Sequence, residues 1–250
     1  MIKISAVIIT YNEERNIERC IKSLQGIVDE IIVVDSFSTD KTKEICLANN
    51  VKFYARNWEG FGNQKNFGIH QAVYDYVLSI DADEALSEIL KQSIIKIKNS
   101  ITNDDAYEMN RLTNYCGQWI KHCGWYPDRK LRIWNRLKGL WDDADVHEKI
   151  EFKTPIKKQL LQGDLHHYSY YTFLEHFERI TKYSILSANK AFKLGEKSSI
   201  IKIIFSPFLR FVRNYFFKLG ILDGFYGYTI SKIEAHGVFV KYLTLYKLGK

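Results

Sequence analysis

Residues 4–14 read ISAVIITYNEE, an almost continuous apolar run that ends in a polar cluster. A short apolar run of this kind is typical of a strand buried on both faces of a parallel sheet. Residues 12–24 then carry apolar side chains at helical spacing, namely Ile17, Cys20, Ile21 and Leu24. A strand followed directly by an amphipathic helix predicts the first βα unit of an α/β fold.

The same order of strand and helix continues to about residue 98. Buried runs at 31–34, 51–54 and 76–80 predict strands, and helices are expected from residue 39 or 40 to 49, at 63–73 and at 84–98. This alternation predicts an α/β fold with an open, mostly parallel, doubly wound sheet. Further on the pattern is less regular: strands are expected at 106–111 and 130–134, a helix at 171–194, and an apolar, basic helix at 200–219 broken near Pro207.

Polar residues follow three of the predicted strands. Asn12, Asp35 and Asp81 each stand just past the carboxyl end of a buried run. Ligands of open α/β sheets bind at this edge. We therefore expect three clusters that are distant in sequence to converge on one crevice.

Charge divides the chain into two parts. Residues 1–150 hold 20 Lys+Arg and 22 Asp+Glu, whereas residues 151–250 hold 16 and 7. We expect a nucleotide-sugar-binding and catalytic domain at 1–160 and a helical, basic region at 161–250 that associates with a membrane or an acceptor. Such a basic, aromatic region favours a polyanionic partner. Four scattered cysteines argue against a zinc site and for a reducing compartment. We expect no signal peptide and no membrane-spanning helix.

Asp81-Ala82-Asp83 is the sharpest chemical motif. Two carboxylates at i and i+2 that leave a buried strand together are suited to a hard divalent cation that also binds a diphosphate. The alternative is a solvated turn, since Asp is common after strands. The position at the end of the fourth strand favours the metal.

Three further clusters have a structural and a functional interpretation. Asn12 and its acidic neighbours fit a capped helix start, or they line the ligand crevice. Asp35 fits a capped turn, or it accepts hydrogen bonds from a base or ribose. Lys65 is either an exposed lysine or a phosphate contact at a helix N-terminus.

The segments AVIITYNEE (6–14), IIVVDSFSTDKT (31–42), QKNFGI (64–69) and LSIDADE (78–84) follow in this order. Together they resemble family-2 glycosyltransferases, which have a GT-A type fold. The resemblance implies an inverting sugar transfer from a nucleotide-sugar, usually a UDP-sugar, with Mg²⁺ or Mn²⁺. It also implies a donor site that comprises Thr10, Tyr11, Asn12, Glu13, Asp35, Lys65, Asp81, Ala82 and Asp83.

Within this site the resemblance assigns separate roles. It brings Tyr11, Glu13 and Asp35 to the nucleoside and Lys65 to the uracil or phosphate. Asp81 is expected at the ribose or metal, and Asp83 on the metal.

Motifs of the second half narrow the resemblance. They are NYCG (114–117), GWYPD (124–128), KLR (130–132), VHE (146–148), GILDG (220–224) and KYL (241–243). They resemble the branch that includes bacterial lipopolysaccharide core β-glucosyltransferases. This implies transfer of glucose to a lipid-linked saccharide such as lipopolysaccharide core. The acid-rich WDDAD at 141–145 departs from the branch, where fewer acids and a Gly or Pro are expected.

Inversion in one displacement needs a general base for the acceptor hydroxyl. Glu148 is the best candidate and Asp145 the alternative. His147 is a candidate metal ligand beside Asp81 and Asp83. The structural alternatives are a surface carboxylate for Glu148 and an interface histidine for His147.

Aromatic and basic residues of the middle segment form a candidate acceptor shelf, because aromatic rings stack on sugars and Arg pairs with phosphates. Its members are Trp119, His122, Trp125, Tyr126 and Arg132. The alternative is that the tryptophans are core.

Two other functions compete with sugar transfer. A sugar nucleotidyltransferase also uses carboxylates and metal, but it usually opens with a Gly- and Arg-rich loop where this chain reads TYNE. A non-catalytic module for membranes or nucleic acid fits the basic C-terminal part, but the acidic crevice would repel nucleic-acid phosphates without a metal. We expect no nucleic-acid partner and a cytoplasmic enzyme at the inner face of the membrane. Residues 197–219 would lie on the anionic surface, or they pack as core.

Overall fold

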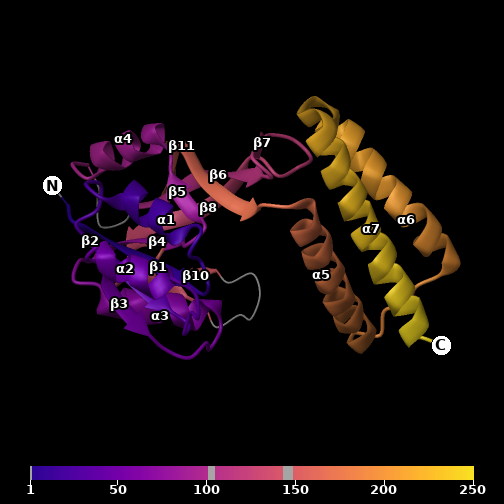
Figure 1. Ribbon diagram of the computed structural model, residues 1–250, viewed down its shortest axis with the longest axis horizontal. Helices are drawn as coiled ribbons and strands as arrows, with labels where there is room; N and C mark the ends of the chain where they lie inside the picture. Colours follow the sequence, from indigo (N-terminus) through magenta and orange to yellow (C-terminus); the bar gives the residue numbers. More distant parts are fainter. Residues whose placement is uncertain (1, 101–104, 143–148) are drawn as a thin grey trace. The chain divides into compact units, whose positions relative to one another are not determined.

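The structure is a computed structural model that describes residues 2–100, 105–142 and 149–250 (Figure 1). The chain forms two compact units. The sheet unit comprises Met1–Arg111 and Asp128–His167, and the helical unit comprises Leu112–Pro127 and Tyr168–Lys250. Each unit has its own buried core.

The sheet unit begins with four strands that alternate with three helices. These are β1 (Ile4–Thr10), α1 (Ile17–Leu24), β2 (Glu30–Asp35), α2 (Thr42–Ala48), β3 (Lys52–Ala55), α3 (Phe61–Gln71) and β4 (Tyr76–Asp81). The following elements are β5 (Glu84–Leu86), α4 (Glu88–Ile97), β6 (Asp105–Tyr115), β7 (Gln118–Ile120), β8 (Asp128–Asn135), β9 (Gly139–Trp141), β10 (Ile150–Phe152) and β11 (Lys157–Tyr170). Both β6 and β11 continue into the helical unit.

The main sheet has the strand order β3-β2-β1-β4-β8-β6-β11-β5. Strands β1 to β4 are parallel, whereas β8 pairs antiparallel with both β4 and β6. Side chains of β1 alternate between two cores, with Ile8 in the core of α1 and Val7 in the core of α3. Helices on both faces and an open sheet confirm the predicted α/β fold of the GT-A type.

Two predicted helix starts are wrong. Helix α1 begins at Ile17 rather than near Asn12, because Asn12 has a left-handed φ of 53° and bonds to the loop after β2. The helix predicted from Glu84 begins at Glu88, because residues 84–86 form β5, which pairs antiparallel with β11. The Ser87 hydroxyl then caps α4 by accepting the Leu90 N–H.

The helical unit contains the helices α5, α6 and α7, which Figure 1 labels, and two short turns between α6 and α7. They are α5 (Phe173–Lys193), α6 (Ile200–Val212), a π turn (Arg213–Phe217), a 3₁₀ turn (Gly220–Asp223) and α7 (Gly224–Leu248). Both α5 and α6 pack on α7. A Cβ on Gly237 would lie 2.4 Å from the Ile180 side chain, so this glycine lets α5 and α7 approach closely. The predicted helical C-terminal appendage is confirmed.

The break predicted near Pro207 does not occur. Helix α6 runs through Pro207 to Val212, and the irregularity follows as the π turn. Proline removes one helical hydrogen bond, and packing of α6 on α7 holds the helix in spite of that loss. Among the described helices, none is both long and apolar enough to cross a bilayer.

Candidate functional site

Three loops meet at the carboxyl edge of the parallel strands. Thr10 at the end of β1 lies opposite Asp35 at the end of β2, and Ile9 lies opposite Asp81 at the end of β4. The strand alternation therefore brings the three predicted clusters to one edge. Beyond Thr10 the side chain of Tyr11 is 58% exposed, which leaves its ring accessible to a flat ligand.

Asn12 ties the loop after β1 to the loop after β2. Its N–H donates to the Ser38 hydroxyl at 2.8 Å, and its amide oxygen accepts the Thr39 N–H at 2.8 Å. The Glu13 N–H donates to the Thr42 hydroxyl at 2.8 Å. These bonds give Asn12 and the Glu13 backbone a structural role in shaping the edge.

Asp35 is almost completely buried, with 2% of the residue exposed. Its two carboxylate oxygens accept the N–H of Ser38 at 2.8 Å and the Ser38 hydroxyl at 2.5 Å. The neighbouring Ser36 hydroxyl accepts the Gln64 amide at 2.9 Å. A carboxylate oxygen has two lone pairs, so Asp35 retains acceptor capacity toward a ligand.

Asp81 and Glu84 share one buried arginine. The Arg132 Nη2 donates to Asp81 Oδ2 at 3.0 Å and to Glu84 Oε1 at 2.6 Å. Glu84 Oε2 accepts the Asp81 N–H at 3.1 Å, so Glu84 also fixes the backbone at the start of the Asp-Ala-Asp turn. The Lys65 Nζ lies 3.5 Å from Asp81 Oδ1.

This network keeps Asp81 ionised. Burial by itself would raise the pKa of the Asp81 carboxyl, but Lys65 and Arg132 outweigh burial and hold that pKa well below its usual range. Burial would likewise lower the pKa of Arg132, but Glu84 and Asp81 raise it above the ordinary value. A carboxylate that is charged at every physiological pH is suited to ribose hydroxyls or a cation.

Asp83 lies beside a histidine that sequence reasoning missed. His167 is on β11, opposite Glu84 of β5, and its Nε2 is 3.2 Å from Asp83 Oδ2. About a quarter of each side chain or less is exposed, 23% for Asp83 and 13% for His167. The pairing of β5 with β11 creates this contact, and the sequence signal for it is the adjacent pair His166-His167.

The side chains near Asp83 fit a divalent cation that is bound partly by the protein and partly by a substrate. In the described part of the chain no group of three His, Cys, Asp or Glu side chains is arranged around a metal position. Mg²⁺ and Mn²⁺ nevertheless often take one or two protein ligands plus water and phosphate oxygens. Asp83 and His167 supply such a pair. Asp81 Oδ1 is buried and accepts no hydrogen bond within the described residues, so it is a further oxygen that a ligand can use.

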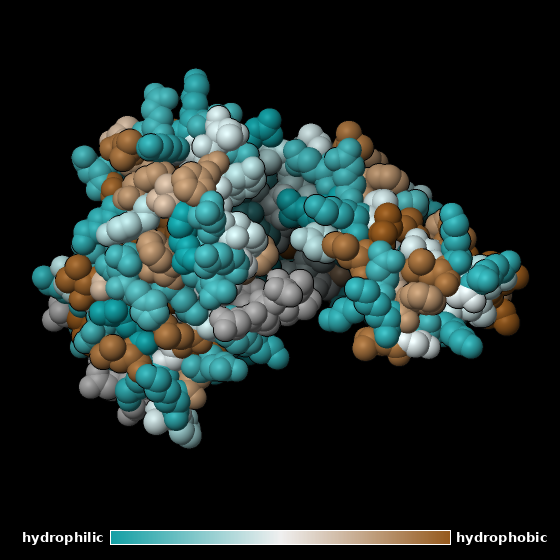
Figure 2. All heavy atoms as spheres, turned by 90° about the horizontal axis from the view of Figure 1, so that it is seen from below, coloured by the Kyte–Doolittle hydropathy of each residue, from teal (hydrophilic) through white to brown (hydrophobic). Residues whose placement is uncertain are grey.

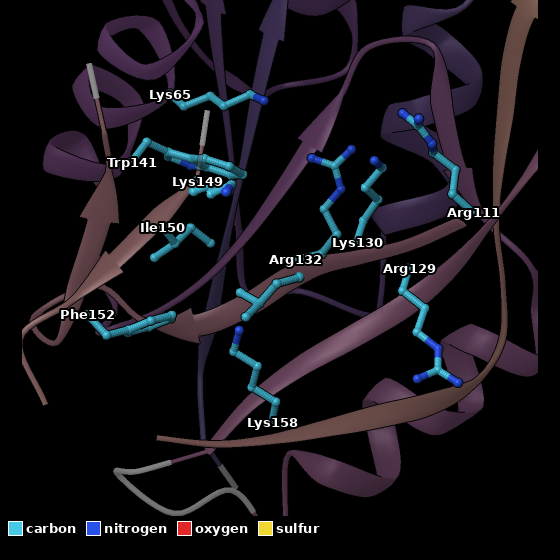
Figure 3. Close-up of a pocket in the computed structure, with 11 residues that line it drawn as sticks. Lys65, Arg111, Arg129, Lys130, Arg132, Trp141, Lys149, Ile150, Phe152 and Lys158 are labelled. Atoms are coloured by element: carbon cyan, nitrogen blue, oxygen red, sulfur yellow. The ribbon is translucent and has the colours of Figure 1, made fainter. Parts of the chain in front are cut away.

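A cavity of about 540 Å³ opens beside this network (Figure 3). Lys65 and Arg132 belong to both the network and the cavity wall. The other lining residues come from β6, β8, β9, β10 and β11 and from residue 149; they are Arg111, Arg129, Lys130, Leu131, Trp141, Lys149, Ile150, Phe152 and Lys158. The wall thus combines many cations with a few apolar rings.

The remaining predicted site residues are distributed as follows. Ala82 is buried between the two aspartates. Of the predicted acceptor shelf, Arg132 belongs to the sheet unit and Trp119 and Trp125 to the helical unit. Trp125 packs on Tyr115 and donates its indole N–H to Glu234 at 2.8 Å, so it stabilises the helical core. The candidate bases Glu148 and Asp145 and the candidate ligand His147 lie outside the described residues.

Comparison with known proteins shows the family of the chain. The family model described as "Glycosyl transferase family 2" matches residues 5–165. An uncharacterized glycosyltransferase of Rickettsia typhi is 33% identical over 99% of this chain and 87% of its own length. The lipopolysaccharide core biosynthesis glycosyltransferase LpsC of Rhizobium meliloti is 30% identical over 85% of this chain and 80% of its own length.

Two solved structures also resemble the chain over part of their length. Glucosyl-3-phosphoglycerate synthase of Mycobacterium tuberculosis, solved with Mn²⁺, UDP and glucosyl-3-phosphoglycerate, is 26% identical with a TM-score of 0.37, over 46% of this chain and 44% of that one. TarS of S. aureus is 18% identical with a TM-score of 0.45, over 75% and 40%. The extent of the family match and the two relatives lead to one conclusion: the chain belongs to glycosyl transferase family 2.

Proposed function

We propose that this glycosyltransferase is an inverting enzyme that moves glucose from UDP-glucose to a lipid-linked saccharide such as lipopolysaccharide core. The observation that carries the proposal is the pair Asp81 and Asp83 at the carboxyl end of β4, in a chain of this family. The similarity to LpsC supports the acceptor class.

The carboxyl edge supports binding of a nucleotide-sugar. The nucleoside lies on the side of β1 and β2, where Tyr11 is exposed and Asp35 retains acceptor capacity. Asp81 then faces the ribose or the cation. Thr10 precedes Tyr11 and Ala82 follows Asp81 in the chain, so both flank this part of the site.

Asp83 and His167 would hold Mg²⁺ or Mn²⁺, and Asp81 and His147 are the other candidate ligands. The bound cation offsets the negative charge that develops on the departing UDP. Lys65, with its Nζ near Asp81, lies where it can also approach a phosphate oxygen. Glu148 takes the proton of the acceptor hydroxyl, and Asp145 is the alternative base.

The exposed apolar face of helix α6 supports the proposal that the acceptor is lipid-linked. No residue of α6 is buried, although most of its side chains are apolar. Five apolar residues recur at the spacing of one helix face and are each 57–69% exposed: Ile201, Ile204, Phe205, Phe208 and Leu209. Figure 2 shows apolar side chains interspersed with hydrophilic ones on the surface of the helical unit. An amphipathic helix with exposed apolar residues and basic neighbours fits the plane of an anionic membrane surface.

Release of nucleotide from a panel of UDP-sugars tests the function. With Mn²⁺ and a saccharide acceptor, UDP should be freed fastest from UDP-glucose. Faster release of UDP from another UDP-sugar would change only the identity of the transferred sugar. Pyrophosphate release from UTP and a sugar phosphate, without UDP release from any sugar, would instead identify a nucleotidyltransferase. A non-catalytic module would show neither.

A further inference from the structure

Among the described residues, the cavity beside Asp81 has more cationic than anionic side chains. Seven cationic side chains line it: Lys65, Arg111, Arg129, Lys130, Arg132, Lys149 and Lys158. Three acids of the described chain pair with some of them. Asp81 and Glu84 contact Arg132, and Asp128 binds both Arg111 at 2.7 Å and Lys130 at 3.0 Å.

Three of the cations make no ion pair with the described residues, namely Arg129, Lys149 and Lys158. Figure 3 shows Lys130 and Arg132 on one side of β8, where the ends of Lys65 and Arg111 also lie, and Arg129 on the other side. Alternate residues of a strand point to opposite faces, so β8 presents cations to both parts of the cavity. Uncompensated like charges in one cavity favour binding of an anion.

Two buried donors in the cavity wall also lack an acceptor. The Trp141 indole Nε1 and the Arg132 Nε have no hydrogen-bond partner within the described structure. An unpaired buried donor costs free energy unless a ligand supplies an oxygen. Trp141, Ile150 and Phe152 add an apolar wall beside these donors, which fits the apolar face of a sugar ring. The cavity is therefore complementary to a sugar that carries a negative charge.

The cavity lies on the acceptor side of the donor site. In the sheet, β1 and β2 flank β4 on one side, and β8 and β6 follow on the other. Because β8 is antiparallel to β4, the N-terminal end of β8, residues 128–132, lies at the carboxyl edge near Asp81. The part of the cavity wall that β8, β6 and β11 form thus lies on the side of the Asp-Ala-Asp turn away from β1 and β2, and Lys65 of α3 borders the cavity from the donor side.

We propose that this cavity binds a phosphate or carboxylate group of the acceptor saccharide, so that the enzyme selects an anionic acceptor. The proposal rests on the proposed function, which assigns the β1 and β2 side to the nucleoside. Arg129 and Lys158 bind the anionic group, and the Trp141 and Arg132 donors bind oxygens of another part of the saccharide, since Arg132 and Arg129 lie on opposite sides of β8 (Figure 3).

Calorimetric titration of the full chain, saturated with UDP and Mn²⁺, tests the site. Glucose 6-phosphate and glucuronate are the anionic probes, and glucose is the neutral probe. We expect at least one anion to bind and glucose to show no binding. Tighter binding of glucose 6-phosphate identifies a phosphate site, and tighter binding of glucuronate a carboxylate site.

Matched lysines of β11 provide the control. Lys158→Gln and Arg129→Gln should each weaken anion binding about tenfold, the size expected for loss of one hydrogen bond to a charged group. Lys157→Gln removes the same charge from the adjacent, exposed residue, which does not line the cavity. It should leave anion binding unchanged, and UDP affinity should be the same in all three variants.

Three results would overturn the proposal. The first is that neither anion binds. The second is that UDP displaces the bound anion, which would make the cavity part of the diphosphate site. The third is that Lys157→Gln and Lys158→Gln weaken anion binding equally. Failure of UDP to bind the wild-type chain contradicts the proposed function alone, because titration of the unliganded protein still tests the anion site.

Discussion

The carboxylate of Glu84 accepts a hydrogen bond from buried Arg132 at 2.6 Å and, through its other oxygen, from the Asp81 N–H at 3.1 Å. Glu84 has 1% and Arg132 3% of the residue exposed. Glu84 therefore joins the arginine to the backbone of the turn that carries Asp81 and Asp83. We predict that Glu84 is a positioning residue for the proposed donor site.

Glu84→Gln should destabilise the sheet unit and misplace Asp81. Glu84→Gln leaves buried Arg132 with Asp81 as its remaining carboxylate, so the cost should not exceed about 3–5 kcal/mol, the cost of removing the single partner of a buried charge. Thermal unfolding and UDP titration measure the two effects. Glu88→Gln removes an acid whose side chain is 82% exposed, and it should change stability by less than about 0.5 kcal/mol. Equal unfolding temperatures for wild type and Glu84→Gln would contradict the positioning role.

Asp83→Ala should lower turnover about a thousandfold, because the metal contributes several kcal/mol to charge stabilisation in the transition state. The fold should survive, since the substitution removes a partly exposed carboxylate whose ion pair is with His167. His167→Gln should raise the Mn²⁺ concentration needed for half-maximal activity. Asp75→Ala, at a side chain 59% exposed, is the control. A folded Asp83→Ala protein with near-normal activity would remove Asp83 from the metal site.

Glu148→Gln keeps the shape of the side chain but cannot accept a proton. Sugar transfer should fall by about a hundredfold or more, the usual contribution of a general base, while UDP affinity stays within a few-fold. Quenched-flow measurement of transfer and titration of UDP separate the two. If Glu148→Gln transfers sugar at the wild-type rate, Asp145→Asn is the next variant and should show the loss.

The sequence was sufficient for the features that depend on local order. Alternating apolar runs and helical spacing predicted β1 to β4, and the strand ends alone predicted that the clusters of Asn12, Asp35 and Asp81 meet at one edge. It was insufficient where distant strands pair. Residues 84–86 have no local signal for β5, because the partner strand β11 comes about 80 residues later.

That pairing also explains the residues that were missed. His167 reaches Asp83 only through β5 and β11, and Glu84 is buried only because Arg132 of β8 lies beside it. Arg132 was predicted to contact the acceptor, and its ion pairs with Asp81 and Glu84 depend on the antiparallel pairing of β4 and β8. Such contacts follow from topology beyond the alternating units, which motif order alone does not specify.

The helical unit should lose stability in mild acid. Burial, with a contribution from Arg179, lowers the pKa of His176 to about 4, and its Nδ1 pairs with the Tyr115 hydroxyl at 2.9 Å. In the unfolded chain the pKa of His176 is near the ordinary value of 6.5. Since the unfolded state binds more protons between these values, stability is full above about pH 6.5 and falls as pH drops toward 4.

Between pH 7.5 and 5 this loss should reach about 2 kcal/mol, because one pKa unit corresponds to about 1.4 kcal/mol. Hydrogen exchange of the α5 amides at the two pH values measures it. His176→Gln should weaken the dependence, whereas His70→Gln, at an exposed histidine, should not. The same pH dependence in wild type and His176→Gln would assign the effect to other groups.

Residues 197–219 should bind an anionic membrane reversibly. This segment contains five basic residues and no Asp or Glu: Lys197, Lys202, Arg210, Arg213 and Lys218. Each basic side chain near an anionic surface contributes about 1 kcal/mol. Co-sedimentation with phosphatidylserine-containing vesicles should therefore be strong at low salt and weaken as salt rises, and neutral vesicles should bind less.

Changing all five residues to Gln should reduce vesicle binding by about a thousandfold. The matched control changes five lysines of α5 and α7, which removes the same net charge outside the segment: Lys182, Lys190, Lys193, Lys232 and Lys241. It should bind more tightly than the first variant, because only residues 197–219 combine charge with the exposed apolar face of α6. Circular dichroism checks that both variants remain helical. Equal indifference of the wild-type protein to anionic and neutral vesicles at low salt would contradict membrane binding by residues 197–219.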